Sequence, residues 1–222
     1  MNGKCKRCGK PVELIDGWIA STYCESCIKI MRAEEEEREK SRIATECLAR
    51  YRKICPSAFR ETEQTLIPDQ NALNKVLKWE FGARGLLIFG DTGLGKTRSV
   101  WLLIRRLMSG GLDVEAMTAS RFSREISTSW DVSGGFARLI NRLVDVPLLF
   151  IDDLGKEAMT TRVEAELFAV VNERTAGGLP IIITTNYGSK SLIGNFSSSE
   201  TAMPLIRRLK EFTTGIHFKN KG

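Results

Sequence analysis

The sequence predicts an α/β fold in which a mainly parallel sheet is flanked by helices, with a small metal-binding module near the N-terminus. Three observations predict it. Apolar runs of strand length alternate with stretches of helical periodicity. One apolar run is followed by a glycine-rich loop, and a later one ends in two acids. Two Cys-x-x-Cys pairs precede the alternation. With 222 residues, 42% of them hydrophobic, the chain can bury one substantial core and carry a small accessory module.

The first segment, residues 1–30, carries four cysteines. Fifteen residues separate the pair Cys5 and Cys8 from the pair Cys24 and Cys27, which is a spacing typical of four-thiolate zinc sites. A segment this short cannot bury enough surface to fold alone. Zinc binding, worth about 10 to 16 kcal/mol in zinc-finger peptides, would therefore supply its folding free energy. Free or redox-active thiols are the alternative reading, and iron is a second candidate metal.

The second segment, residues 31–59, is rich in charged side chains and predicts a solvated linker helix that Pro56 ends. Its apolar stripe is thin and consists of Ile43, Cys47, Leu48 and Tyr51. Cys47 and Cys55 lack metal-ligand spacing, so we expect ordinary buried thiols there. A helical run over 66–81 then opens the third segment, residues 60–222.

A phosphate-binding loop is predicted after the apolar run 86–89. GDTGLGKT matches the pattern Gly-x-x-x-x-Gly-Lys-[Ser/Thr], in which glycines let backbone N–H groups turn toward a phosphate. Lys96 is placed to reach the β- and γ-phosphates of a nucleotide, and Thr97 to hold Mg²⁺. A helical stripe over 100–107 follows, and Gly110 and Gly111 end it. The residues expected to contact the nucleotide are Gly90, Asp91, Thr92, Gly93, Leu94, Gly95, Lys96, Thr97 and Arg98.

Residues 114–118 read as a short strand, and two helices are expected next, over 121–130 and 136–144. The second of these helices carries Arg138 and Arg142 away from its apolar stripe. They form either a solvated face or a patch that contacts phosphates.

A second buried strand, 148–151, ends in Asp152 and Asp153. Downstream of a phosphate-binding loop, this pattern is typical of a Walker B motif. Asp152 would hold Mg²⁺, directly or through water, and Asp153 would orient or deprotonate the attacking water. Alone, two acids after a strand are weak evidence, because many strands end in an Asx turn.

The remaining elements continue the alternation. A helix is expected over 163–171, a buried strand over 180–185 and a last strand over 215–218. Fourteen residues follow Arg208, which we expect to hold that strand but no helical lid.

Four pieces, GDTGLGKT, VPLLFIDDLGKE, IIITTNY and LIRRLKE, together resemble the DnaC/IstB-like branch of the AAA+ P-loop ATPases, over residues 60–222. The resemblance implies that Asn186 is the sensor 1 residue, acting on the attacking water or the γ-phosphate. It also implies that Arg208 is an arginine finger given to the ATP of a neighbouring subunit, with Arg207 as the fallback. Asp153 stands where many AAA+ proteins carry glutamate.

The resemblance implies an ATPase that loads a replicative helicase during DNA replication, binds single-stranded DNA and self-associates through its ATP sites. Two alternatives stay open: an IstB-like transposition helper that binds duplex DNA, and a nucleotide-gated adaptor with little turnover. A small-molecule kinase is disfavoured because Asn186 and Arg208 have natural roles in an AAA+ site. The expected cofactors are ATP, Mg²⁺ and Zn²⁺.

Charge and hydropathy set limits on partners and location. Residues 1–60 hold 13 Lys and Arg against 9 acids, and the remainder holds 20 against 18, so the cysteine-bearing part is the more basic. This balance permits nucleic-acid contact without requiring it. No apolar stretch approaches the roughly 18 residues that cross a bilayer, and the N-terminus lacks the apolar core of a signal peptide. We therefore expect a cytoplasmic protein with no membrane partner.

Overall fold

The computed structural model describes residues 3–12, 14–15, 18–19, 22–197 and 199–220. The chain forms two compact units, Met1–Glu46 and Cys47–Gly222. In the described part of the chain, no helix is both long and apolar enough to cross a membrane. The division into residues 1–30, 31–59 and 60–222 stays a prediction.

The first unit contains an antiparallel hairpin and most of a long helix. Strands β1 (Leu14–Ile15) and β2 (Trp18–Ile19) pair with each other, and a single bridge joins Lys4 to Pro11. Helix α1 (Glu25–Ile54) starts within the second Cys-x-x-Cys pair, earlier than the charged segment that predicted it. The acidic Glu25 in its first turn suits this start, because a negative side chain complements the positive N-terminal end of a helix.

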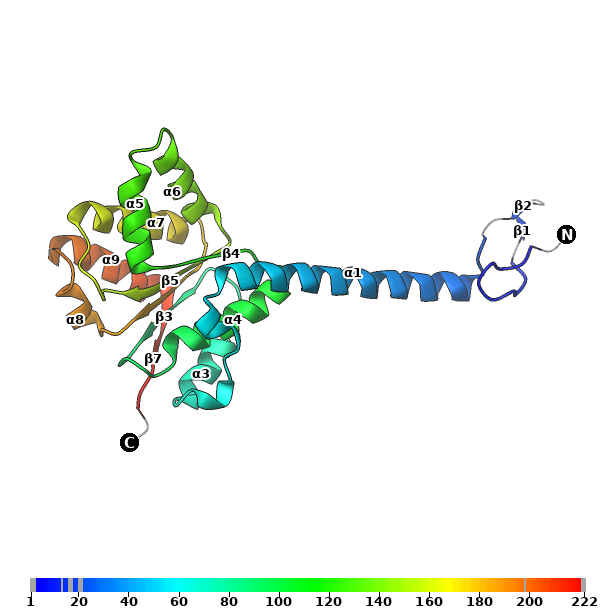
Figure 1. Cartoon of the computed structure of the whole chain (residues 1–222), viewed down its shortest axis with the longest axis horizontal. Helices are drawn as coiled ribbons and strands as arrows, with labels where there is room; N and C mark the ends of the chain where they lie inside the picture. Colours follow the sequence, from blue (N-terminus) through cyan, green and yellow to red (C-terminus); the bar gives the residue numbers. More distant parts are fainter. Residues whose placement is uncertain (1–2, 13, 16–17, 20–21, 198, 221–222) are drawn as a thin grey trace. The chain divides into compact units, whose positions relative to one another are not determined.

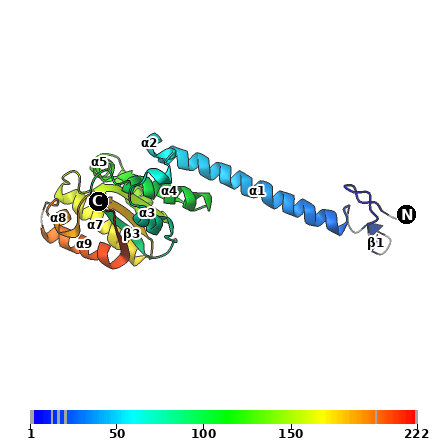
Figure 2. The ribbon, with the colours of Figure 1, turned by 90° about the horizontal axis from the view of Figure 1, so that it is seen from below.

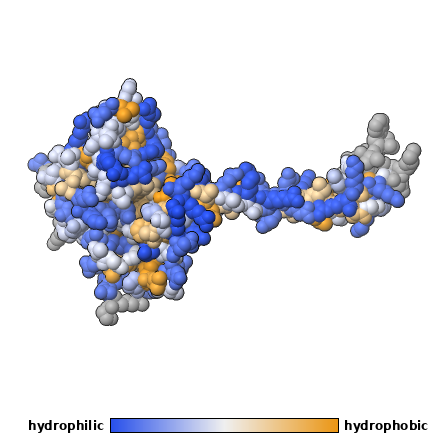
Figure 3. Space-filling model, viewed as in Figure 1, coloured by the Kyte–Doolittle hydropathy of each residue, from blue (hydrophilic) through white to orange (hydrophobic). Residues whose placement is uncertain are grey.

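Helix α1 is one continuous 30-residue helix (Figure 2), and its surface is mostly hydrophilic with separate apolar spots (Figure 3). The exposed apolar side chains in the first unit include Ile30, Met31 and Ile43. Arg7, between the first two cysteines, donates from both terminal nitrogens to the carboxylate of Glu34 on α1. This bidentate pair ties the first Cys-x-x-Cys loop to the helix.

The second unit alternates helices and strands, as the sequence predicted. Its elements are α2 (Ser57–Arg60), η1 (Gln64–Leu66), α3 (Gln70–Leu77), β3 (Gly85–Phe89), α4 (Lys96–Ser109), β4 (Val114–Thr118), α5 (Ala119–Ser129), α6 (Gly135–Asp145), β5 (Leu148–Leu154), α7 (Thr161–Ala176), β6 (Ile181–Thr185), α8 (Ser189–Ile193), α9 (Ser199–Phe212) and β7 (Thr213–His217). The helical run expected over 66–81 is shorter in the structure. Asp69 caps α3 by accepting the N–H of Ala72, so the helix begins only after it.

The five strands of this unit form a parallel sheet in the order β4-β5-β6-β3-β7. Figures 1 and 2 show α3 and α4 on one side of the sheet and α7 and α9 on the other. Because successive strand side chains face opposite sides, Leu86 and Ile88 join the core under α3 and α4, whereas Leu87 joins the other. The predicted α/β class, with a parallel sheet flanked by helices, is confirmed.

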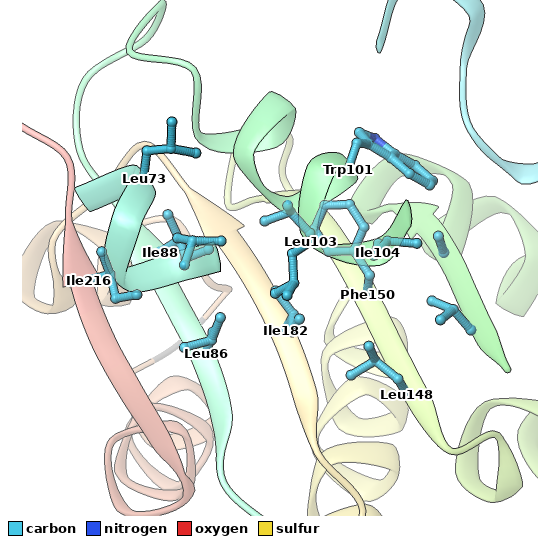
Figure 4. Packing of buried hydrophobic residues seen from close by; sticks show 14 of the residues in the cluster. Leu73, Leu86, Ile88, Trp101, Leu103, Ile104, Leu148, Phe150, Ile182 and Ile216 are labelled. Carbon is cyan, nitrogen blue, oxygen red and sulfur yellow. The ribbon is translucent and has the colours of Figure 1, made fainter. Parts of the chain in front are cut away.

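The core between α4 and the sheet is built around Trp101 (Figure 4). Its ring makes edge contacts with Phe150 of β5 and with Tyr51 in the last turns of α1, at centroid distances of 5.7 and 6.1 Å. Such aromatic pairs contribute about 0.5 to 1.5 kcal/mol beyond the area that they bury. This packing fixes α4, and therefore the loop at its N-terminus, against the strands.

Arg174 of α7 is fully buried and holds the two central strands at their amino ends. Its guanidinium donates to carbonyl oxygens before β5 and before β6, those of Leu143, Val144, Val146, Pro147 and Pro180. Burial lowers the pKa of this guanidinium to about 10, although the negative charge of Asp145 acts in the opposite direction. A buried arginine with this many acceptors fixes where the strands begin.

Candidate nucleotide site and cysteine cluster

The predicted site residues of the second unit, except Arg208, meet at one edge of the sheet. Strands β3, β5 and β6 are parallel, so their carboxyl ends lie together, which is where open α/β sheets bind ligands. A cavity of about 430 Å³ lies there. Its lining includes Gly95, Lys96, Thr97, Asp153 and Asn186.

The glycines of the loop between β3 and α4 are required by close contacts. Gly90 has a φ of 141°, and a Cβ there would lie 2.2 Å from the carbonyl oxygen of Phe218. Gly95 has a φ of 85° and packs on Ile67. Side chains at either position would push the loop away from its support, so the loop geometry depends on both glycines.

Lys96 is the first residue of α4, directly after the loop, and is buried. Its Nζ donates to the carbonyl oxygens of Gly90 and Asp91, both at 2.8 Å, and to Oδ1 of Asn186 at 2.7 Å. Burial lowers the pKa of the ammonium, and the charges of Asp153, Asp152 and Asp91 oppose this in part. Lys96 and Asn186, 90 residues apart in the sequence, are therefore direct neighbours.

Asp152 is buried at the end of β5, and Thr97 donates to its Oδ1 at 2.8 Å. Thr184 of β6 donates to the same oxygen. Burial raises the pKa of the Asp152 carboxyl, the two hydroxyls act in the opposite direction, and the charge of Asp153 adds to the rise. The hydroxyl of Thr97 and the carboxylate of Asp152 are both hard oxygen ligands, the type that Mg²⁺ prefers.

We expect Asp152→Asn to raise the melting temperature of the second unit at pH 8, measured without nucleotide or divalent metal. Because the folded pKa lies above the ordinary value, stability is full below that ordinary value and falls as pH rises through the raised pKa. The amide carries no charge and keeps an oxygen for both hydroxyls. Each kcal/mol gained raises the melting temperature by roughly 2 to 4 °C in a domain of this size.

The control for this experiment is Asp131→Asn in an exposed turn, which we expect to leave the melting temperature unchanged. The gain from Asp152→Asn should shrink as the pH falls below the ordinary pKa of the carboxyl, because the group then becomes neutral in the unfolded state as well. An equal or lower melting temperature at pH 8 would mean that Lys96 compensates the buried charge fully.

Asp153 has a φ of 58°, the left-handed region that residues with a Cβ rarely adopt. Its carboxylate lies 3.7 Å from Nζ of Lys156, and the residue lines the cavity. Strain of this kind persists only where the surroundings enforce it, and it clusters at functional sites.

Part of the cavity wall comes from residues that the sequence did not single out. They belong to the segment before α3 and are Phe59, Glu61, Thr62, Glu63, Leu66 and Pro68. Arg98 connects this wall to α4. It donates to the carbonyl of Ala58 and the hydroxyl of Thr62, and it lies 5.4 Å from the ring centre of Phe59.

Arg208 lies outside this cavity. It is on α9, where its Nε donates to Oδ1 of Asn172 on α7 at 3.1 Å and its guanidinium lies over Phe212. With Arg207, Phe168 and Met203 it lines a separate cavity of about 540 Å³. Within one chain, therefore, Arg208 is not brought to the residues at the carboxyl edge of the sheet.

The four cysteines of the first unit converge. The sulfurs of Cys5, Cys8, Cys24 and Cys27 all lie within 4.8 Å of one another, and those of Cys8 and Cys24 are 3.5 Å apart. A tetrahedral zinc ion with Zn–S bonds of about 2.3 Å would separate its sulfurs by roughly 3.8 Å, so the cluster fits one ion. Burial raises the pKa of the Cys5 thiol, but backbone hydrogen bonds at Cys24, Cys8 and Arg7 together lower it to about 6. That environment favours a thiolate at Cys5, the form that binds metal, whereas the hydrogen bond to Cys8 and burial raise the pKa of the Cys27 thiol to about 12.

Cys47 and Cys55 belong to the second unit and are buried there, as expected for ordinary thiols. Among the described residues they join no group of metal ligands.

Comparison with known proteins agrees with this geometry. A family model described as IstB-like ATP binding protein matches residues 24–220. An ATP-binding protein of an insertion sequence in Mycobacterium tuberculosis is 24% identical over 191 residues, which cover 82% of this chain and 74% of that protein. The replicative helicase loader DnaI of Bacillus subtilis is 26% identical over 118 residues, which cover 53% of this chain and 38% of the loader.

Among solved structures, the DnaC helicase loader has a TM-score of 0.57 to this chain at 18% identity, covering 77% of this chain and 99% of that one. This likeness confirms the fold. The family match extends over most of the chain and includes the phosphate-binding loop, both acids and Asn186. The chain, which is similar in sequence to the helicase loader DnaI and in fold to the helicase loader DnaC, therefore belongs to the IstB-like ATP-binding proteins, a family of AAA+ P-loop ATPases.

Proposed function

We propose that ATP binds in the cavity at the carboxyl edge of the sheet, with its phosphates on the loop 90–98 and Mg²⁺ held by Thr97 and Asp152. The hydroxyls of Thr97 and Thr184 both donate to Oδ1 of Asp152, so we assign its Oδ2 to the metal, directly or through a water molecule. When bound, Mg²⁺ neutralises phosphate charge and fixes the phosphate geometry. Lys96 adds its positive charge at the β- and γ-phosphates.

Two further side chains are assigned to the attacking water. Asp153 lines the cavity and is about one-third exposed, so its carboxylate is positioned to orient or accept a proton from a water molecule. Asn186 is assigned to the same water or to the γ-phosphate, and its bond to Lys96 supports this.

Arg208 is assigned to the ATP of a neighbouring copy of the chain. The support is its position on α9, on a cavity separate from the one that holds Lys96. Turnover would then require self-association, and ATP would act as a switch for assembly.

In the first unit we assign one Zn²⁺ to Cys5, Cys8, Cys24 and Cys27. The support is the convergence of four sulfurs on a volume that suits one tetrahedral ion. The zinc would close the loop that contains Arg7 onto the start of α1.

For cellular function we propose an ATP-dependent loader that delivers a replicative helicase to single-stranded DNA in the cytoplasm. The observation that carries it is a separate N-terminal unit, with its own small core, in a chain similar to the loader DnaI. A loader needs two binding functions, one for nucleotide and one for the helicase. The second unit offers the nucleotide site, and the first unit is free to bind a protein partner.

The test is a binding assay with the replicative helicase of the host. We expect a complex in ATP and Mg²⁺ that weakens in ADP, is lost with Lys96→Ala, and is lost with Cys27→Ser although that variant still binds ATP. Single-stranded DNA should bind more tightly than duplex of the same length across a salt series. Absence of any helicase complex in ATP would contradict the loader function.

A second candidate is a transposition helper, favoured by the similarity to an insertion-sequence protein over 82% of this chain. It would give the opposite DNA preference, duplex over single strand, and a complex with a transposase. A nucleotide-gated adaptor is the third outcome, recognised by partner binding that needs ATP in a wild-type protein that barely turns ATP over.

A further inference from the structure

The two acids at the end of β5 lie in an irregularity of the sheet. Strand β5 pairs with β6 in parallel, Ile151 facing Ile183, but Leu154 faces Thr185. Three steps along β5 thus match two along β6, so one extra residue is accommodated between Ile151 and Leu154. Such bulges re-aim side chains near active sites.

Thr184 lies on β6 opposite this bulge and is fully buried. Its hydroxyl contacts both acids: Oγ1 accepts the backbone N–H of Asp153 at 2.9 Å and donates to Oδ1 of Asp152. A hydroxyl has one proton and two lone pairs, so one group serves both partners. The bond to the Asp153 backbone is made at the residue whose φ is 58°.

Thr185, the next residue, bonds the far side of the same bulge. Its hydroxyl donates to the carbonyl of Leu154 at 2.7 Å and accepts the N–H of Tyr187 at 3.2 Å. It is as buried as Thr184 but bonds neither carboxylate. The pair offers a natural comparison between a threonine at the acids and one that only supports the strand.

We propose that Thr184 is a positioning residue of the ATP site, whose hydroxyl orients the Asp152 carboxylate toward Thr97 and holds the Asp153 backbone so that its carboxylate faces the cavity. This inference rests on the proposed roles of Asp152 and Asp153. In the sequence, Thr184 is a polar residue inside a buried strand, a position that needs hydrogen-bond partners. The two acids are those partners.

Thr184→Val keeps the shape of the side chain and removes the hydroxyl. We expect kcat for ATP to fall by about 10- to 100-fold, the usual cost of losing a partner that orients a metal ligand, with a smaller rise in KM. Thr184→Ser restores the hydroxyl and should restore most of kcat. Thr185→Val leaves the carbonyl of Leu154 and the N–H of Tyr187 without their partner. It should therefore lower the melting temperature about as much as Thr184→Val does, but keep kcat.

A second readout does not need turnover. The affinity of a fluorescent ATP analogue is measured with Mg²⁺ and with EDTA, and the gain due to Mg²⁺ should be smaller in Thr184→Val than in wild type or Thr185→Val. Should the valine variant fail to fold, Thr184→Ala takes its place in both measurements. The proposal would be overturned if Thr184→Val kept both the wild-type kcat and the wild-type increase in ATP affinity on adding Mg²⁺. It would also be overturned if Thr184→Val and Thr185→Val lost kcat and the Mg²⁺-dependent affinity to the same extent.

A separate result would contradict the proposed function without deciding the role of Thr184. Asp153→Asn with undiminished turnover would remove the role assigned to that carboxylate, and the Mg²⁺ gain would still decide whether Thr184 orients Asp152.

Discussion

Arg208→Ala should abolish most ATP turnover while leaving ATP binding intact. Arginine fingers in GTPases contribute about 10³- to 10⁵-fold in rate, and we expect an effect toward the lower end of that range. Binding should survive because Arg208 does not line the cavity that holds Lys96 and Thr97. The measurements are steady-state phosphate release and the dissociation constant of a fluorescent ATP analogue.

Mixing two inactive variants tests whether the arginine acts across subunits. Lys96→Ala supplies an intact Arg208, and Arg208→Ala supplies an intact phosphate-binding loop. Their mixture should recover turnover. Where the phosphate-binding loop of an Arg208→Ala subunit faces Arg208 of a Lys96→Ala subunit, that interface contains both the intact loop and the arginine. No recovery, together with weakened ATP binding in Arg208→Ala alone, would contradict a role in a neighbouring site.

Arg207→Ala is the matched control. Arg207 is exposed on the adjacent position of α9 and lines the same cavity as Arg208. It should keep turnover within a few-fold of wild type. If Arg207→Ala is the inactive variant instead, the assignment passes to that residue. Because Arg208 also bonds Asn172, melting curves of both variants must be compared before rates are interpreted.

The strands and the phosphate-binding loop could be predicted because their signals are local. A buried parallel strand reads as an unbroken apolar run, and a loop that needs positive φ reads as glycine. Thus β3, β4, β5 and β6 were predicted within about one to three residues at each end, and β7 within two. The contact of Lys96 with Asn186 also follows, since parallel strands end at one edge of the sheet.

What the sequence missed depends on partners that are far apart in the chain. Nothing local marks Arg174 as buried, because its acceptors are carbonyls in the last turn of α6, between α6 and β5, and before β6. The cavity wall at 59–68 likewise depends on how that segment folds back on α4. Thr184 did carry a signal, a hydroxyl in a fully buried run, but only the sheet register pairs it with Asp152.

Removing the metal from the four-cysteine cluster should unfold the first unit and spare the second. Structural zinc contributes about 10 to 16 kcal/mol in zinc-finger peptides, far more than the core of this unit can supply. Among the described residues of this unit, that core has Cys5, Val12 and Cys27 as its buried members, with Tyr23 and Cys24 against it. Two of its three buried members are themselves proposed ligands, so metal and core are lost together.

The measurement is metal analysis combined with limited proteolysis. Purified protein should hold one zinc per chain, and Cys27→Ser or a chelator should remove it. Cleavage should then appear in the first unit, while residues 47–222 stay resistant and keep ATP binding. Cys47→Ser is the control, because Cys47 is buried outside the cluster and should retain zinc.

Loss of zinc should also affect helix α1. The first half of α1 is mostly charged, and an isolated helix of about 15 residues is marginal in water unless something stabilises its ends. With zinc at Cys24 and Cys27, the first turn is fixed, and Arg7 reaches Glu34 two turns later. Loss of zinc should therefore lower helicity measured by circular dichroism, and Arg7→Ala should lower it less. A protein with no bound metal, full helicity and unchanged protease resistance would contradict the zinc assignment and leave the cysteines as ordinary thiols.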